Sequence, residues 1–190
     1  FRRSLDIAGH VSWVPGGTPL GSGRLGVMVP VGVGLALGIR AAHGSEALVL
    51  CHCGDAGWIS GQALNGFNAA HLHRAPIVFV MHRNGIQLSG TTAQVMDKDP
   101  RPMIAAMGVE ILEIPSLMDR ARLFRAYGEA AAHAAAGRPV LIYPVGAGGH
   151  GQPPVTLAGF GEAYGIESYV AALAAKHQVS LDTPIRVPGS

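Results

Sequence analysis

The sequence predicts a three-layer α/β/α fold built on a mostly parallel β-sheet. Short apolar segments alternate with helical segments along the chain, which is typical of parallel strands joined by crossover helices. Each strand-like segment is apolar throughout instead of at every second residue, and this indicates that both faces of the sheet are covered. The chain has 190 residues, 48% of them hydrophobic and 14% charged, so it can bury one sizeable core.

Four strands are expected, each a short apolar run that a turn or a polar residue ends. They span residues 47–53, 76–81, 109–114 and 140–143. Helices are expected over residues 25–42, 62–73, 101–107 and 166–176. A further long helix is expected to begin at a Ser116 cap, to run to Ala136 and to end at Gly137. Residues 1–24 contain many glycines and prolines and are interpreted as a structured loop.

One domain is expected over residues 1–180, followed by a Pro-rich linker or docking tail over residues 181–190. The sequence begins at Phe1, with neither an initiator methionine nor a signal peptide. We therefore expect a processed, split or partial chain.

The charge balance argues against nucleic acid and membranes as partners. The chain has 14 basic and 12 acidic residues and a net charge of +2, which is too small an excess for a basic binding surface. Its longest apolar stretch, residues 25–37, is broken by glycines and a proline and is shorter than the roughly 20 residues that span a bilayer. The two cysteines, Cys51 and Cys53, make no disulfide framework, which favours a reducing, cytoplasmic compartment.

Polar residues with metal-binding chemistry follow two of the predicted strands. Gly54-Asp55-Ala56 follows the first strand and Asn84-Gly85-Ile86 the second, with Asn84 29 residues after Asp55. Ligands of parallel sheets bind beyond the carboxyl ends of the strands, where these two segments would meet. A carboxylate, an amide oxygen and a backbone carbonyl, with diphosphate oxygens and a water, would make an octahedral Mg²⁺ site. The alternative is that Asp55 caps the next helix and that Asn84-Gly85 is an ordinary turn.

The same two segments resemble the thiamine-diphosphate motif of the transketolase family. Residues 53–62 read CGDAGWISGQ and residues 82–90 read HRNGIQLSG, and the family's motif begins Gly-Asp-Gly and ends near Asn. The resemblance covers nearly the whole chain and implies the pyrophosphate-binding domain of the thiamine-diphosphate-binding fold, without its opening segment. Five further segments resemble other elements of the family: Gly9-His10, residues 23–26, residues 105–108, residues 137–142 and Gly149-His150-Gly151.

The resemblance implies roles for the residues of the motif. Asp55 and Asn84 would bind Mg²⁺ through their side chains, and Ile86 would bind it through its carbonyl. Gly54 and the backbone at Ala56 would hold the diphosphate of the cofactor.

The resemblance also implies residues outside the motif. Gly23 and Leu25 would line the thiamine. His10 and His150 would face the substrate or the reacting thiamine as catalytic residues, since the pKa of histidine suits proton transfer near neutral pH. The activating glutamate of the family lies in a pyrimidine-binding domain, for which the sequence offers no candidate. The resemblance therefore implies a pyrimidine-binding domain or subunit as partner, in a homo- or hetero-oligomer such as the family's dimer.

Several residues depart from the family's pattern. Ala56 replaces the second glycine of the motif, so its backbone must avoid the conformations that only glycine adopts easily. Ser60 and Asn65 stand where transketolases usually carry glutamates that link two active sites. Arg24 and Val11 stand where the family has prolines. These departures are expected to affect catalytic activity more than cofactor binding.

The function that the resemblance implies is a transferase of carbohydrate metabolism. It would move a two-carbon ketol unit between sugar phosphates, with thiamine diphosphate and Mg²⁺ as cofactors. One alternative is the alpha subunit of a 2-oxo acid dehydrogenase-type thiamine enzyme, which the residues after Asn84 disfavour. Another is a cofactor-binding subunit whose catalysis has lapsed, and Ala56, Ser60 and Asn65 favour that interpretation.

Three other sequence features were considered as functional sites: a dinucleotide-binding motif, a zinc motif and Arg83. Residues 21–26 fit a dinucleotide-binding G-x-G-x-x-G with Glu46 twenty residues beyond it, but no strand precedes them. Cys51-His52-Cys53 suggests part of a zinc site, but on a strand both thiols point to one face and His52 to the other. Buried thiols are the better interpretation. Arg83 adjoins the metal turn and is expected either to contact a sugar phosphate or to form an ion pair.

Overall fold

The computed structural model describes residues 24–44, 48–83, 85–87, 90–117, 119–146, 157–158 and 167–183. The chain divides into two compact units, one of residues 22–151 and one of residues 1–21 together with residues 152–190. The division into a domain of residues 1–180 and a tail of residues 181–190 remains a prediction.

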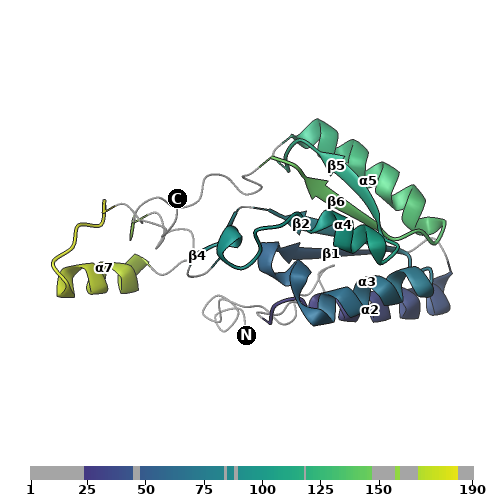
Figure 1. The fold of residues 1–190 in the computed structure, drawn as a ribbon, viewed down its shortest axis with the longest axis horizontal. Coiled ribbons are helices and arrows are strands. Elements are labelled where there is room, and N and C mark those ends of the chain that lie inside the picture. Colours follow the sequence, from purple (N-terminus) through teal and green to yellow (C-terminus); the bar gives the residue numbers. More distant parts are fainter. Residues whose placement is uncertain are drawn as a thin grey trace. The chain divides into compact units, whose positions relative to one another are not determined.

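The first unit is built on a parallel sheet of four strands in the order β1-β2-β6-β5 (Figure 1). The strands are β1 (Val49–Gly54), β2 (Ile77–His82), β5 (Glu110–Ile114) and β6 (Val140–Pro144). Every neighbouring pair runs parallel, with Cys51 opposite Phe79 and Phe79 opposite Leu141. The predicted strands and the parallel sheet are therefore confirmed, with small shifts at the strand ends.

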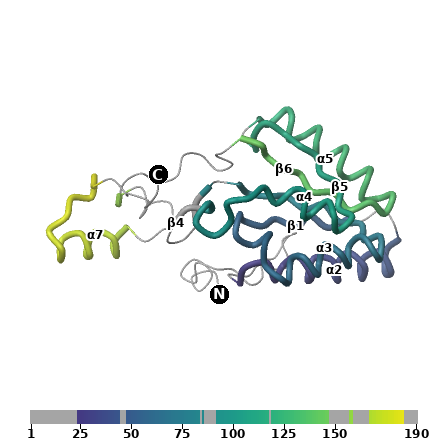
Figure 2. Tube along the Cα trace, viewed as in Figure 1, coloured from purple at the N-terminus to yellow at the C-terminus, as the bar shows by residue number. Residues whose placement is uncertain are grey.

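Helices cover both faces of this sheet, which confirms the three-layer architecture. α2 (Met28–His43) and α3 (Gly61–Leu72) lie side by side on one face, and α5 (Arg120–Ala135) covers the other (Figures 1 and 2). The short helix α4 (Arg101–Ala106) precedes β5.

The side chains of β2 divide between two hydrophobic cores because successive strand residues point to opposite faces. Phe79 packs edge-on against Trp58 and Phe67, with ring centroids 6.1 Å and 5.0 Å away. Val78 and Val80 belong to the other core, which includes alanines of α5. All five side chains are at most 1% exposed, which explains why this strand is apolar throughout.

Helix α5 begins later than the sequence predicts. Its N-cap is Asp119, whose carboxylate accepts a hydrogen bond from the Arg122 amide at 3.0 Å, so the predicted Ser116 cap is wrong. The Ser116 carbonyl instead accepts the Asp119 amide in a turn, at 3.3 Å. Aspartate and serine are comparable caps, so propensity alone does not choose between them. The helix ends before Gly137, as predicted, and the φ of +77° there suits glycine.

Two short elements beside the strand ends were not predicted. A 3₁₀ helix, Asp55–Ile59, follows β1 directly. The two-residue strands β3 (Ile86–Gln87) and β4 (Gly90–Thr91) form an antiparallel pair after β2. Strands of two residues are too short for a hydrophobic period to appear. Their pairing brings the Thr92 amide to the Gly85 carbonyl, at 2.9 Å.

The second unit contains α7 (Glu167–Lys176), close to the helix predicted over residues 166–176. The amides of Leu157 and Ala158 donate hydrogen bonds to the carbonyls of Thr183 and Leu181, at 3.2 Å and 2.9 Å. In the part of the chain that the structure describes, no helix combines the length and the apolar content needed to cross a membrane. The predicted loop over residues 1–24 lies outside the described residues, except for Arg24.

Helix α3 packs closely on α2 at Gly66, and this contact gives a test of the fold. A Cβ built at Gly66 would lie 2.8 Å from the Pro30 nitrogen and 2.8 Å from Val29 Cγ1. Alanine is normally more stable than glycine inside a helix, but here the added methyl would meet backbone. We expect Gly66→Ala to lower the free energy of unfolding by about 1–3 kcal/mol, measured by urea denaturation.

The matched control is Gly128→Ala on the exposed side of α5, where a Cβ meets nothing within 4 Å. This substitution should raise the free energy of unfolding by about 0.5–1 kcal/mol. Equal stabilisation by the two alanines would contradict the close packing of α3 on α2.

Candidate active site

Asp55 stands at the carboxyl end of β1, as the first residue of the 3₁₀ helix. Among the described residues it is the one charged side chain that is buried, with 3% exposed. The alternative that Asp55 caps the next helix is wrong. That cap is Ser60, whose hydroxyl oxygen accepts a hydrogen bond from the Ala63 amide at 3.2 Å. The Asp55 carboxylate instead makes hydrogen bonds outside its own segment.

The Asp55 carboxylate is joined to the segment that follows β2. Its Oδ2 accepts a hydrogen bond from the Gly85 amide at 3.0 Å and another from the Thr92 hydroxyl at 2.8 Å. The Thr92 amide donates in turn to the Gly85 carbonyl at 2.9 Å. The predicted meeting of the two segments at one edge of the sheet is thus observed for Asp55 and Gly85.

One hard oxygen donor is described at this edge of the sheet, the buried Asp55 carboxylate. A buried carboxylate stands beside a turn of backbone that continues into Ile86, and carboxylate and carbonyl oxygens are the ligands that Mg²⁺ takes. Ile86 is placed in β3, whereas Asn84 lies outside the described residues. Within the described ranges, no three His, Cys, Asp or Glu side chains gather as a metal site.

The backbone near the start of α2 approaches the 3₁₀ helix closely. Gly26 has a φ of +74°, and a Cβ there would lie 1.7 Å from Ser60 Oγ. A Cβ on Gly57 would lie 2.1 Å from Cys53 Sγ and 3.3 Å from the Gly26 nitrogen. Only glycines allow this approach, which brings Leu25, 62% exposed, to the turn that follows Asp55.

Two departures from the family's pattern have a local explanation. Ala56 is not among the described residues with positive φ, so alanine fits the 3₁₀ helix without strain, as predicted. Ser60 caps α3 and also donates to the Gly57 carbonyl at 3.0 Å, while Asn65 is exposed on α3.

The other predicted site residues differ in whether the structure describes them. Gly54 ends β1 and is exposed. His10, Gly23 and His150 lie outside the described residues.

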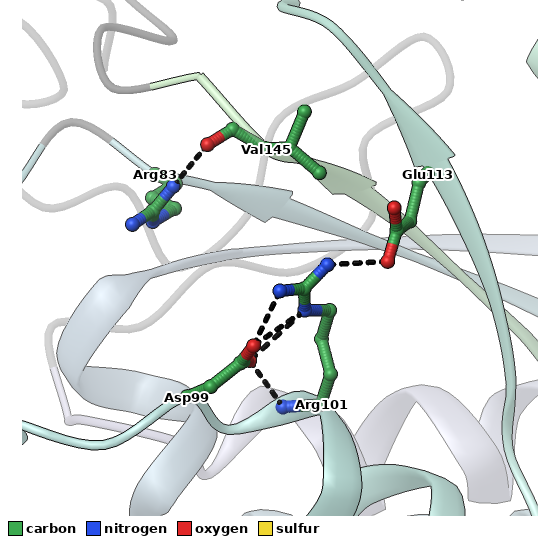
Figure 3. Close-up of polar contacts among 5 residues, drawn as sticks. All are labelled: Arg83, Asp99, Arg101, Glu113 and Val145. Carbon is green, nitrogen blue, oxygen red and sulfur yellow. Dashed lines mark hydrogen bonds and ion pairs between the residues drawn. The ribbon is translucent and has the colours of Figure 1, made fainter.

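A cavity of about 380 Å³ opens at the carboxyl ends of β2 and β6, beside Asp55. Arg101 lines it and lies between Asp99 and Glu113, forming an ion pair with each (Figure 3). The hydrogen bond from Arg101 lowers the pKa of Asp99, and the same bond raises the pKa of Arg101. The charge of Arg101 is therefore balanced within the protein.

Arg83 lines the same cavity but has a different partner. It donates a hydrogen bond to the Val145 carbonyl (Figure 3), and no ion pair joins it to a described carboxylate. Of the two alternatives expected for Arg83, the ion pair is thus not found among the described residues. The guanidinium carbon of Arg83 lies 5.7 Å from the centroid of the Tyr143 ring, and that of Arg101 lies 4.8 Å from it.

Tyr143 completes the wall of the cavity and is 3% exposed. Burial raises the pKa of its phenol, so the hydroxyl stays protonated and is a donor at neutral pH.

Sequence reasoning did not single out Thr92 or Tyr143 as site residues. Tyr143 could have been identified because its hydroxyl-bearing side chain stands near the carboxyl end of an otherwise apolar strand. Thr92 gave no signal, because its position depends on the β3–β4 pair.

The zinc site that Cys51-His52-Cys53 suggested, and that was disfavoured, does not form in the described part of the chain. Cys51 is buried toward α2, where its thiol donates to the Met28 carbonyl at 3.5 Å. His52 points away from it, and its Nδ1 lies 2.7 Å from Nε2 of His82. The interpretation of Cys51 as a buried thiol is confirmed.

The comparisons with known proteins agree with this geometry. The model of the dehydrogenase E1 component family matches residues 16–150, which is 135 of the 190 residues. No curated protein sequence matches the chain at a significant level.

Solved structures of thiamine enzymes share the fold. The transketolase of Campylobacter jejuni aligns with 65% of this chain and 20% of its own, at 24% identity and a TM-score of 0.59. A mutant transketolase of Pichia stipitis aligns with 89% of this chain and 26% of its own, at 19% identity and a TM-score of 0.58. A protein of Mycobacterium smegmatis described as thiamin diphosphate-dependent aligns with 67% of this chain and 23% of its own, at 30% identity and a TM-score of 0.50. The chain thus spans about a fifth to a quarter of the length of these proteins.

The parallel sheet, its helices and these alignments define an α/β domain of the thiamine-diphosphate-dependent enzymes. The chain belongs to the dehydrogenase E1 component family, and its fold is that of a transketolase-like, thiamine-diphosphate-binding N-terminal domain. The resemblance read from the sequence is thereby confirmed.

The hydroxyl of Thr92 should contribute to the placement of the Asp55 carboxylate. Thr92→Val keeps the shape of the side chain but removes one donor from a buried carboxylate, which should lower the free energy of unfolding by about 1–3 kcal/mol. Thr92→Ser keeps the hydroxyl and should recover most of the loss. Urea denaturation of the two variants measures the difference, and equal losses for valine and serine would contradict this role.

The cysteines should react slowly in the folded protein. Burial, with a smaller contribution from Cys53, raises the pKa of Cys51 to about 12, and burial also raises the pKa of Cys53. Because the thiolate is the reactive form, iodoacetamide at pH 8 should label neither cysteine quickly. Mass spectrometry over time, with a urea-unfolded sample as control, measures the labelling. Rapid labelling of Cys51 in the folded chain would contradict the burial.

Proposed function

We propose that this chain is the pyrophosphate-binding part of a transketolase-like, thiamine-diphosphate-dependent transferase that moves a two-carbon ketol unit between sugar phosphates. The observation that carries the proposal is the Asp55 carboxylate, buried at the end of β1 and hydrogen-bonded to the turn after β2. Two segments far apart in the sequence thus meet at the edge of the sheet where ligands of this architecture bind.

Thiamine diphosphate and Mg²⁺ are the proposed cofactors, and thiamine diphosphate, when bound, supplies the electron sink for carbon–carbon bond cleavage. In this proposal Asp55 and Asn84 hold Mg²⁺ through side-chain oxygens, and the Ile86 carbonyl is the third protein ligand. The backbone of Gly54 and Ala56 holds the diphosphate. Shared ligation by protein and phosphate oxygens is how Mg²⁺ usually binds.

Four further residues have proposed roles in contacting thiamine and substrate. Leu25 is a large apolar side chain, 62% exposed, beside the Gly26 turn, and it suits contact with the apolar part of the thiamine. Gly23 is proposed to lie along the same surface. His10 and His150 are proposed to hold and move protons at substrate oxygens, because an imidazole titrates near neutral pH.

The site is proposed to be completed by a pyrimidine-binding domain, either in the same polypeptide or in another subunit of a homo- or hetero-oligomer. This chain covers 20% of the length of the Campylobacter jejuni transketolase. We also propose a cytoplasmic location, for which the free thiols of Cys51 and Cys53 are the supporting observation.

Two alternative functions have support of their own. The match to the dehydrogenase E1 component family favours the alpha subunit of a 2-oxo acid dehydrogenase-type enzyme. The absence of carboxylates at Ser60 and Asn65 favours a cofactor-binding subunit without catalysis. Assays of the chain with its partner distinguish the three. Ketol transfer from a ketose phosphate supports the first proposal, decarboxylation of a 2-oxo acid supports the second, and cofactor binding without either reaction supports the third.

The cofactor assignment depends on the Asp55 carboxylate. Native mass spectrometry of the chain with thiamine diphosphate and Mg²⁺ should show the mass of one cofactor and one metal per site, and thermal melting should rise with cofactor concentration. Asp55→Asn keeps a side chain of the same shape but removes the charge, and should weaken Mg²⁺-dependent cofactor binding by at least tenfold.

The matched control is Glu129→Gln, an exposed carboxylate on α5, which should bind the cofactor like the original chain. Equal cofactor binding by the Asp55→Asn variant would contradict the metal site. Failure of the original chain to bind thiamine diphosphate in the presence of its partner would contradict the proposed function itself.

A further inference from the structure

Helix α5 presents a face that no described element covers. Its buried side chains pack on β2, β5 and β6, so its other side points away from the sheet (Figure 1). Phe124 lies on that side and is 82% exposed, more than any other large hydrophobic side chain that the structure describes. The outer side of a surface helix normally carries polar and charged residues. An exposed aromatic ring at this position is therefore unexpected for a helix that faces only water.

Phe124 belongs to a stripe along α5 that has no polar side chain. The stripe follows the spacing of a single helix face, and all its members are exposed: Ala121, Phe124, Gly128, Ala132 and Ala135. It is about 21 Å long, at about 1.5 Å per residue. A Cβ on Gly128 would meet nothing within 4 Å, so the backbone there is open to a close approach. The stripe thus combines one large side chain with a run of small ones, and a continuous exposed apolar patch marks an interaction site.

Arg125 and Glu129 border the stripe on one side and give it a charge pattern. Both side chains are exposed and stand four residues apart on one helix, where a pair can interact. No ion pair joins them, or joins either to another described residue. When two helices run antiparallel about a twofold axis, each border faces the same border of the other helix in reverse order. Arg125 of one copy then lies opposite Glu129 of the other, twice in each dimer. The charges therefore favour a second copy of this chain as the occupant of the stripe.

We propose that α5 is a self-association surface, on which two copies of this chain pair with their α5 helices antiparallel. Phe124 of each copy packs on Gly128 and Ala132 of the other, as a large side chain packs between small ones in paired helices. The same residues serve both copies, so the contact closes at a dimer. No residue of the stripe lines the cavity beside Asp55. The dimer therefore forms through a surface separate from the proposed cofactor site and goes beyond the proposed function.

Sedimentation equilibrium of the full chain, without cofactor, tests this dimer. Two short helices bury less surface than a standard interface of about 1,600 Å², so the dimer should be weak and should form at micromolar chain concentrations. Phe124→Ser should weaken dimerisation by about tenfold or more, because each dimer loses two aromatic contacts. Gly128→Ala should weaken it severalfold, because its methyl occupies the space on which Phe124 of the second copy packs. The matched control is Leu72→Ser on α3, 68% exposed and outside the stripe, which should leave the dimerisation constant unchanged.

A charge exchange tests the antiparallel pairing. Arg125→Glu places two carboxylates opposite each other, and Glu129→Arg places two guanidinium groups there, so each variant alone should dimerise about fivefold or more weakly. In an equimolar mixture the two variants should form a mixed dimer with the affinity of the original chain, because every carboxylate then faces a guanidinium. Native mass spectrometry separates the mixed dimer from the two others by mass. The matched controls are Glu167→Arg and Lys176→Glu at exposed positions of α7, which should dimerise like the original chain.

The outcomes separate this inference from its alternatives and from the proposed function. A chain that stays monomeric at every concentration would overturn the proposal, and so would equal dimerisation by the original and Phe124→Ser chains. Loss of the dimer in both charge variants without recovery in their mixture would contradict the antiparallel pairing. Amide hydrogen exchange in α5 that slows only when a pyrimidine-binding partner is added would assign the stripe to that partner and also overturn the proposal. If the chain dimerises through α5 but never binds thiamine diphosphate, the proposed function fails and the self-association surface stands.

Discussion

The buried carboxylate of Asp55 is the constraint on which the rest of the site depends. A charge that is only 3% exposed requires hydrogen-bond donors, and these come from Gly85 and Thr92, which follow a different strand. The end of β1, the turn after β2 and the segment after β4 are therefore held together at one edge of the sheet. On the other side, the contact of Gly26 with Gly57 brings the start of α2 to the same edge.

The polar groups around this carboxylate differ in how their charges are balanced. Arg101, at the start of α4, is balanced by two carboxylates. Arg83, at the end of β2, has a carbonyl and an aromatic ring as its described partners. The two arginines face the same tyrosine ring, and the charge of Arg83 also helps to lower the pKa of Asp99.

Sequence reasoning was most reliable where local pattern and burial agree. The strand at residues 76–81 was recognised because Val78, Phe79 and Val80 are all apolar, and the structure explains the pattern by the two cores they enter. The backbone conformation at Ala56 was also inferred correctly, since an L-residue avoids positive φ. The start of α5 was misplaced because Ser116 and Asp119 are both good caps, and only the turn at residues 116–119 decides between them.

The sequence by itself determined the α/β/α class and placed Asp55 and Gly85 at one sheet edge, because parallel strands joined by helices bring their carboxyl ends together. The tertiary structure alone decided which side chains complete the site. Thr92 reaches Asp55 across 37 positions through the β3–β4 pair, and Tyr143 meets Arg83 across neighbouring strands. Such contacts depend on the three-dimensional path of short, aperiodic segments, and no local spacing in the sequence encodes them.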